Sequence, residues 1–173
     1  MSILAFCGSL RRLSMNAALL RATARLAPPG QRVDIFAGLP ALPLFNPDLE
    51  ADLPRPVRTM HSAVAACDAL LIASPEYAHG VSGVLKNALD WLVSFEGFID
   101  KRVAIFNASP RSTHADTSLR EILTTMSAHI VPDACLALPL RGLNLTEQQM
   151  FDSQHAPAIR QALLTLAPQE ARS

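Results

Sequence analysis

The chain has 173 residues, half of them apolar and 17% charged, with 15 basic and 15 acidic side chains. This length and composition predict a single folded domain over residues 1–173 and exclude a disordered chain. The formal net charge of zero gives no electrostatic reason to expect nucleic acid or a membrane surface as a partner, and it mildly favours self-association.

The three cysteines, Cys7, Cys67 and Cys135, are widely spaced, and each lies in apolar sequence. We therefore expect buried, reduced thiols and neither a disulfide framework nor a metal site. No apolar run is long enough to span a membrane, and Arg11 and Arg12 interrupt the first apolar run too early for a signal peptide. These features predict a cytoplasmic protein.

Short apolar runs alternate along the chain with longer stretches of helical periodicity. The predicted strands are residues 2–7, Arg32–Phe36, Ala69–Ala73, Arg102–Phe106 and Ala134–Leu138. The predicted helices are Ser14–Leu26, Pro56–Ala66, Ser82–Phe95, Ser118–His129 and Ala156–Leu166. This alternation predicts an α/β fold, a flavodoxin-like, doubly wound three-layer sandwich whose five parallel strands follow the order 2-1-3-4-5.

The first loop, Gly8–Asn16, leaves a strand at a glycine and enters a helix through hydroxyls and arginines. Such a loop has the layout of a phosphate site, because free N–H groups and the helix dipole favour negative charge at a helix start. Polar side chains add further donors, namely Ser9, Ser14, Asn16 and either Arg11 or Arg12. The alternative is an ordinary loop in which Ser14 caps the helix.

The spacing of this loop excludes two other phosphate-binding motifs. The chain has no Gly-Lys pair followed by Ser or Thr, and the dinucleotide fingerprint requires three glycines where only Gly8 is present. We therefore expect side chains to hold the single terminal phosphate of a mononucleotide.

The segment Gly38–Pro56 is a long, proline-rich connection. Its prolines exclude a helix and make a central strand improbable. Long ordered loops with exposed Leu and Phe side chains usually cover a ligand or another subunit, and the alternative is packing on the same domain.

Three loops are expected to form the ligand site, because doubly wound sheets bind ligands outside the carboxyl ends of their strands. The loops Gly8–Asn16, Ser74–Gly83 and Asn107–Asp116 hold most of the polar residues that need an explanation. The second loop can present backbone groups to the edge of a flat heterocycle. In it, His79 could donate to a reduced ring or be merely exposed, and Glu76 could be a helix-dipole partner or a solvated carboxylate.

Three segments carry a resemblance to a known family. They are Gly8-Ser9-x-Arg11-x-x-Ser14-x-Asn16, Ser74-Pro75-Glu76-Tyr77 and Gly83-Val84-Leu85-Lys86-Asn87-Ala88-Leu89-Asp90-Trp91. In this order and spacing they resemble the NADPH-dependent FMN reductase family, which includes quinone, chromate and azo-dye reductases, and the similarity runs from residue 2 to about residue 138. The resemblance implies a flavodoxin-like fold, tightly held FMN, NADPH or NADH as electron donor, and a homodimer or homotetramer.

The resemblance also implies a set of site residues. The first loop would bind the FMN phosphate through Ser9, Arg11, Ser14, Met15 and Asn16. The second loop would line the flavin ring, largely through its backbone, with Pro75, Glu76, Tyr77, Ala78, His79 and Gly80, of which Glu76, Tyr77 and His79 support the ring. Ser109 would pack beside the ribityl chain, and no side chain acts as a nucleophile. The helix that contains Lys86, Asn87, Asp90 and Trp91 helps form the dimer contact in the family, so we assign these four residues to structure and assembly.

The resulting prediction is an FMN-dependent NAD(P)H oxidoreductase that passes two electrons as hydride to a small acceptor, such as a quinone, free flavin, azo compound or metal oxyanion. One alternative is a flavodoxin-type electron carrier, although carriers are typically acidic and this chain is neutral. The other is a flavin-binding protein with little NAD(P)H turnover. It stays open because residues 78–80 and 111–115 differ from the Asn, aromatic and Ser residues and the paired glycines that are usual in the family.

Overall fold

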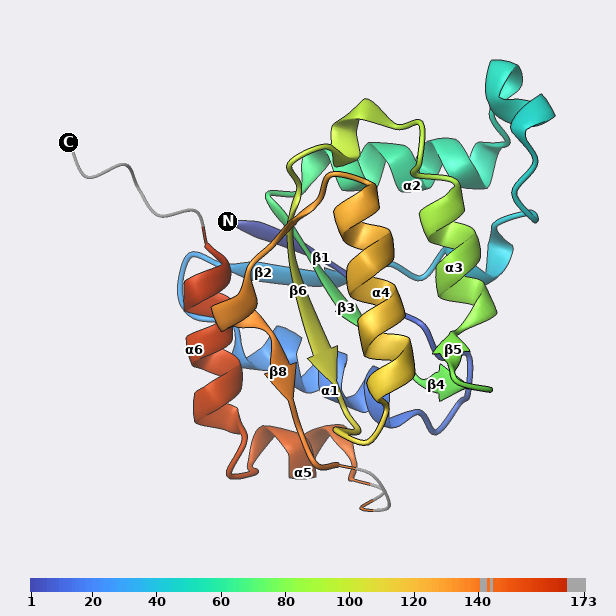
Figure 1. The fold of residues 1–173 in the computed structure, drawn as a ribbon. Helices are drawn as coiled ribbons and strands as arrows, with labels where there is room; N and C mark the ends of the chain where they lie inside the picture. Colours follow the sequence, from blue (N-terminus) through green and yellow to red (C-terminus); the bar gives the residue numbers. More distant parts are fainter. Residues whose placement is uncertain (141–142, 144, 168–173) are drawn as a thin grey trace.

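A computed structural model describes residues 1–140, 143 and 145–167 of this chain (Figure 1). Its central sheet runs in the order β2-β1-β3-β6-β7, and β8 also pairs with β6. Every pairing in this sheet is parallel. The six strands are β1 (Ser2–Cys7), β2 (Arg32–Ile35), β3 (Ala69–Ala73), β6 (Arg102–Asn107), β7 (His129–Ile130) and β8 (Leu136–Ala137).

The predicted count of five strands is wrong, because two short strands occupy the last position of the sheet. β7 pairs with Arg102 and Val103 at the start of β6, and β8 pairs with Phe106 and Asn107 at its end. A 3₁₀ turn, Pro132–Ala134, separates the two strands. Proline cannot donate a hydrogen bond to the ladder, so pairing with β6 stops after β7 and resumes after the turn. The turn includes Ala134, and the predicted strand Ala134–Leu138 is therefore shortened to β8.

Helices cover both faces of the sheet (Figure 1). They are α1 (Met15–Leu26), α2 (Arg55–Ala66), α3 (Gly83–Asp90), α4 (Thr113–Thr125), α5 (Glu147–Phe151) and α6 (Ala156–Leu166). Ile3 and Ala5 of β1 join the core under α1, α5 and α6, whereas Leu4 and Phe6 join the core under α2, α3 and α4. This alternation, which follows from the pleat, confirms the predicted α/β layers with a parallel central sheet. Among the described residues, no helix has the length and apolarity needed to cross a bilayer.

Helix boundaries depart from the prediction where local contacts compete with periodicity. α4 begins at Thr113 and not at Ser118, because the carboxylate of Glu76 accepts the N–H of Ala115 in its first turn. It ends before Ser127, whose positive φ of 59° reverses the chain ahead of β7. The hydrophobic periodicity did not predict the short helix α5. Thr146 and Gln149 nevertheless form a capping box that marks its start.

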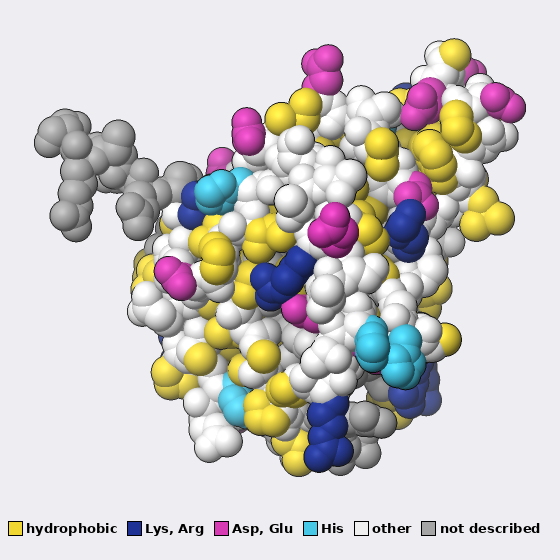
Figure 2. Space-filling model, in the orientation of Figure 1, with side chains coloured by type: hydrophobic (Ala, Val, Ile, Leu, Met, Phe, Trp, Pro, Cys, Tyr) yellow, Lys and Arg dark blue, Asp and Glu magenta, His cyan; other side chains and the backbone are white. Residues whose placement is uncertain are grey.

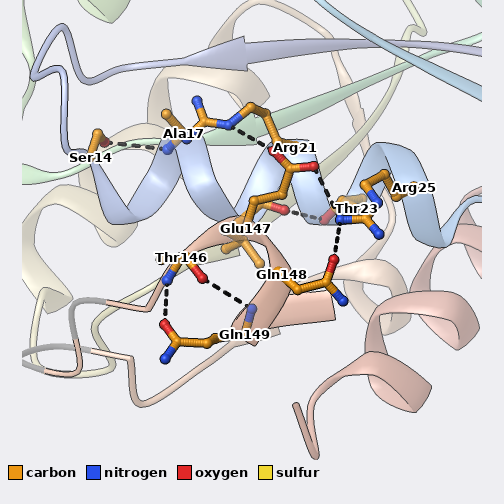
Figure 3. Close-up of polar contacts among 10 residues, drawn as sticks. Ser14, Ala17, Arg21, Thr23, Arg25, Thr146, Glu147, Gln148 and Gln149 are labelled. Atoms are coloured by element: carbon orange, nitrogen blue, oxygen red, sulfur yellow. Dashed lines mark hydrogen bonds and ion pairs between the residues drawn. The ribbon is translucent and has the colours of Figure 1, made fainter. Parts of the chain in front are cut away.

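Helix α5, near the end of the described chain, contacts α1 through polar side chains (Figure 3). Arg21 pairs with Glu147 at 3.2 Å, and Arg25 donates to Gln148 at 2.9 Å. The guanidinium of Arg25 also lies 4.4 Å from the ring centroid of Phe151. These contacts hold α5 against the helix whose first turn borders the first loop.

The proline-rich segment, Gly38–Pro56, packs on its own domain. It does so through Asn87 of α3 and through Trp91, the residue that follows this helix. The Asn87 amide accepts the N–H of Phe45 at 2.8 Å and donates to the carbonyl of Pro43 at 2.9 Å. Trp91 donates its indole N–H to the same carbonyl at 2.8 Å, and its ring meets that of Phe45 edge-on at 5.0 Å. Leu44, which lies between Pro43 and Phe45 in the sequence, is 83% exposed. These contacts confirm the structural part of the role predicted for Asn87 and Trp91, and the assembly part stays a prediction. Lys86 and Asp90 form the expected surface ion pair.

The prediction that this segment contains no helix is wrong for 3₁₀ turns. Two short 3₁₀ helices, Leu39–Ala41 and Pro47–Asp52, lie within it, and each has proline in its first positions. A proline there loses no hydrogen bond, because the first N–H groups of a helix have no partner within it.

Replacing Asn87 with alanine is expected to lower the free energy of unfolding by about 1–3 kcal/mol, because it leaves the Phe45 N–H without its partner and removes one of the two hydrogen bonds to the Pro43 carbonyl. Urea unfolding measures this change. Lys86→Ala, on the exposed side of the same helix, removes only a surface ion pair and should change stability by less than about 1 kcal/mol. Equal losses in the two variants would contradict the assigned role of Asn87.

Candidate functional site

A cavity of about 610 Å³ lies at the carboxyl ends of β1, β3 and β6. The predicted site residues that line it are Ser9, Arg11, Ser14, Met15, Asn16, Pro75, Glu76, Tyr77, Ala78, His79 and Ser109. Gly80 is predicted but does not line it. The prediction missed Leu13, Ser74, Asn107, Ala108, Arg111, Ser112 and Leu140. Most of these lie in the three loops that the sequence had marked, so the loops are a better signal than the individual residues.

The first loop begins where β1 and β3 are tightly joined. The N–H of Gly8 donates to the carbonyl of Ala73 at 2.8 Å. A Cβ atom at position 8 would lie 2.8 Å from both Ser74 Cβ and Ser82 Oγ, which is closer than real Cβ contacts come. The glycine therefore allows the first and second loops to approach each other at the floor of the cavity.

Ser14 fits both readings of the first loop. Its Oγ accepts the N–H of Ala17 at 3.3 Å and so caps α1, which confirms the capping interpretation (Figure 3). It also lines the cavity together with Ser9 and Asn16, and all three polar residues are buried. Capping and ligand binding are thus compatible at this helix start.

Two buried polar atoms in the cavity wall have no hydrogen-bond partner among the described residues. They are Asn16 Oδ1, from the first loop, and Ser109 Oγ, from the third. Buried polar groups nearly always have a partner, so these two atoms indicate that the cavity takes a polar ligand. Rotation of the Asn16 amide also offers its NH₂ group, and the Ser109 hydroxyl both donates and accepts.

The charge around the cavity favours an anion. Arg11 and Arg111 line it, and neither forms an ion pair with any described residue. Glu76 is the one carboxylate among the described lining residues, and its Oε2 accepts the N–H of Ala115 at 2.8 Å. The interpretation of Glu76 as a helix-dipole partner is therefore confirmed. Two free guanidinium groups remain for a phosphate.

A β-hairpin that the sequence analysis did not predict forms the side of the cavity. β4 (Glu76–Tyr77) pairs antiparallel with β5 (Gly80–Val81). Ala78 and His79, at the turn, have positive φ angles of 48° and 60°. Asn-Gly is the usual pair at such a turn, so Ala-His gave no hairpin signal.

The cysteines are less uniformly buried than expected. Cys67 is buried, whereas Cys7 and Cys135 are only partly so, and all three are free thiols. Burial raises the pKa of Cys7, at the end of β1, and that of Cys67. Because the thiolate is the reactive form, a raised pKa makes Cys7 a poor nucleophile beside the site.

Comparison with known proteins identifies the family. The sequence model of the NADPH-dependent FMN reductases matches residues 1–141. An NAD(P)H-dependent FMN reductase of Pseudomonas aeruginosa is 36% identical over 172 residues, which cover 95% of this chain and 92% of that protein. The chain belongs to the NADPH-dependent FMN reductase family. As a member it is an oxidoreductase whose flavin is FMN and whose electron donor is NAD(P)H.

Further relatives of this FMN reductase agree with that assignment. A probable NADPH:quinone oxidoreductase of Oryza sativa subsp. japonica is 34% identical over 176 residues, covering 95% of this chain and 89% of the relative. The solved structure of the flavoenzyme NAD(P)H:(acceptor) oxidoreductase FerB from Paracoccus denitrificans superposes with a TM-score of 0.81 at 23% identity. It covers 95% of this chain and 94% of the other, and it supports the fold class alone.

Proposed function

We propose that the cavity holds FMN with its phosphate in the first loop, and that this FMN reductase passes electrons from NAD(P)H to quinone-type acceptors. The observation that carries the proposal is a pair of buried atoms, Asn16 Oδ1 and Ser109 Oγ, that have no partner among the described residues. They lie on the first and third loops of a cavity whose two arginines form no ion pair with a described residue. A phosphate ester with a polyhydroxyl chain offers complementary groups to both.

Residues of all three loops share the binding of FMN in this proposal. Arg11 and the N–H groups at the start of α1 neutralise the phosphate, and Ser9 adds a hydroxyl. Ser109 and Asn16 meet the hydroxyls of the ribityl chain. Pro75 and Tyr77 present the wall on which the flat ring rests, and backbone N–H groups of the hairpin stabilise negative charge at its edge.

When bound, FMN supplies the hydride chemistry, which no side chain of this family member provides. The residues of the chain bind and orient. Half of the Tyr77 side chain surface is exposed (51%), so the ring wall stays open to solvent. An open wall lets the nicotinamide and the acceptor use the same face in turn, as a ping-pong scheme requires.

The acceptor class rests on the relatives. The Oryza protein is described as a probable NADPH:quinone oxidoreductase, and a quinone reductase of Escherichia coli is 31% identical over 94 residues, about half of each chain. A flat quinone can stack where a flat nicotinamide has left. Quinones are therefore the acceptors we propose, ahead of azo compounds and metal oxyanions.

Anaerobic reduction tests the proposed function. The FMN-loaded protein is titrated with NADPH and then with a quinone while the flavin absorbance near 450 nm is recorded. We expect one equivalent of NADPH to bleach the flavin and one equivalent of quinone to restore it. Flavin colour without bleaching would overturn the proposal in favour of a binding protein, and a stable one-electron form would favour a carrier.

We also propose that the chain works as a homodimer or homotetramer in the cytoplasm. Leu44, in the proline-rich segment, and Val93, next to Ser94, whose hydroxyl donates to Glu50 of that segment at 2.7 Å, are exposed apolar side chains. Covering them with a second copy would remove apolar surface from water. Light scattering of the purified protein is expected to give the mass of two or four chains, and the mass of one chain would contradict the proposal. The three free thiols are typical of a reducing compartment.

A further inference from the structure

Two histidines from distant parts of the chain meet at the rim of the cavity. The ring centroids of His79 and His114 are 4.2 Å apart and the rings are tilted by 45°. His79 lies at the tip of the β4–β5 hairpin and lines the cavity, and His114 lies in the first turn of α4. Figure 2 shows two neighbouring histidine side chains on the surface in this region, open to solvent.

The structure holds this pair in place at a conformational cost. His79 adopts a left-handed backbone, which glycine or asparagine would adopt more easily. Strained backbone of this kind concentrates at functional sites. A hydrogen bond from the Ala115 N–H to Glu76 joins the hairpin to α4 directly beside the two rings. Neither the phosphate loop nor the ring wall of the proposed function requires an imidazole at position 79.

We infer that His79 donates the proton that a quinone needs during its reduction, and that His114 positions His79 and returns a proton to it. This inference rests on the proposed function, because it concerns the acceptor that occupies the same cavity. Imidazole suits the task because one ring nitrogen can give up a proton while the other accepts one from a neighbour.

The step balances. Reduced FMN is oxidised and gives a hydride, which brings the quinone two electrons and one hydrogen. The second hydrogen of the hydroquinone arrives as a proton: an N–H bond of protonated His79 breaks, an O–H bond forms on the quinone oxygen, and the imidazole nitrogen keeps the electron pair. His79 is then protonated again through His114 or from water.

The charged groups around the pair do not compete for this role. Glu76 accepts the Ala115 N–H at the start of α4, and Asp116 is paired with Arg120 at 2.8 Å. Arg111 lines the same cavity, and a guanidinium donates hydrogen bonds without giving up a proton. The described cavity-lining residues with an O–H group are Tyr77 and five serines, and phenols and aliphatic alcohols are much weaker acids than a protonated imidazole.

His79→Asn tests the inference without endangering the fold, because asparagine tolerates the left-handed turn. The FMN-loaded variant is reduced with NADPH and mixed in a stopped-flow instrument with a quinone or with ferricyanide, which accepts electrons without a proton. We expect quinone to reoxidise the variant about 100-fold more slowly than the parent protein. The rates with ferricyanide and with NADPH should fall far less than the quinone rate, because neither reaction takes a proton from His79.

Two further measurements separate proton donation from a structural role. Added imidazole should restore part of the quinone rate in His79→Gly, which leaves room for it. In the oxidised protein, nuclear magnetic resonance should show the His79 ring signals moving when a hydroquinone binds, and their pH titration changing in His114→Asn. His129→Asn, which changes an exposed histidine on β7 at the opposite end of β6, should alter none of these quantities.

Equal losses of the quinone and ferricyanide rates in His79→Asn, or no loss with either, would overturn the inference while leaving the reductase function intact. Failure of NADPH to reduce the parent protein would instead overturn the proposed function.

Discussion

Gly8→Ala is expected to abolish tight FMN binding and to lower the free energy of unfolding by about 1–3 kcal/mol. The added methyl group would lie 2.8 Å from Ser74 Cβ and from Ser82 Oγ, and neither atom belongs to a long side chain that can swing away. Because the Gly8 N–H is bonded to the carbonyl of Ala73, the start of the first loop is tied to the end of β3, and relieving the contact must also disturb this junction. That disturbance separates the phosphate donors from the ring wall.

Urea unfolding and quenching of FMN fluorescence measure the two effects. Gly83→Ala is the matched control, because a Cβ atom there meets nothing within 4 Å and alanine favours the helix that begins at this position. The double variant Gly8→Ala, Ser74→Gly removes the close contacts with the Ser74 side chain, leaves the one with Ser82 Oγ, and should recover part of the stability. A Gly8→Ala protein with parental stability and affinity would show that close approach of the loops is not required.

Arg11→Ala is expected to weaken FMN binding about 10- to 100-fold, since a charge-assisted hydrogen bond to phosphate contributes about 1.5–3 kcal/mol. Arg11 is exposed and forms no ion pair with a described residue, so its loss should leave the free energy of unfolding nearly unchanged. Titration of the apoprotein with FMN at several salt concentrations measures the effect, which should shrink as salt screens the charge.

Arg12→Ala is the control for this substitution. Arg12 is the next residue and is equally exposed, but it does not line the cavity. We expect its replacement to change FMN affinity by less than twofold, an order-of-magnitude bound for a distant solvated charge. Similar losses in the two variants would indicate a general electrostatic effect and would remove Arg11 from the proposed site.

The layers of the fold could be predicted from the sequence, because buried parallel strands are nearly uniform apolar runs. Ala69–Ala73 and the helix Ala156–Leu166 have the predicted limits. The prediction failed where a tertiary contact or a proline overrode the pattern. Glu76 extends α4 at its start, and Pro132 divides the last strand position into β7 and β8. Neither effect is local enough to appear in hydrophobic periodicity.

The sequence predicted which loops border the candidate site better than it predicted the contacts between their side chains. That the first, second and third loops border one cavity follows from the parallel order of β1, β3 and β6. That Ser109 and Asn16 would be left without partners depends on packing that no sequence pattern reports. The contact between His79 and His114 depends on the unpredicted hairpin and on the early start of α4. The roles of the individual residues toward FMN stay predictions.

The most direct measurement of the central claim compares FMN with riboflavin, which lacks the phosphate. Calorimetric titration of the apoprotein should give one FMN bound per chain at micromolar or tighter affinity, and riboflavin should bind at least about tenfold more weakly. If the two flavins bind equally well, or if FMN does not bind, the first loop is not a phosphate site and the account is wrong.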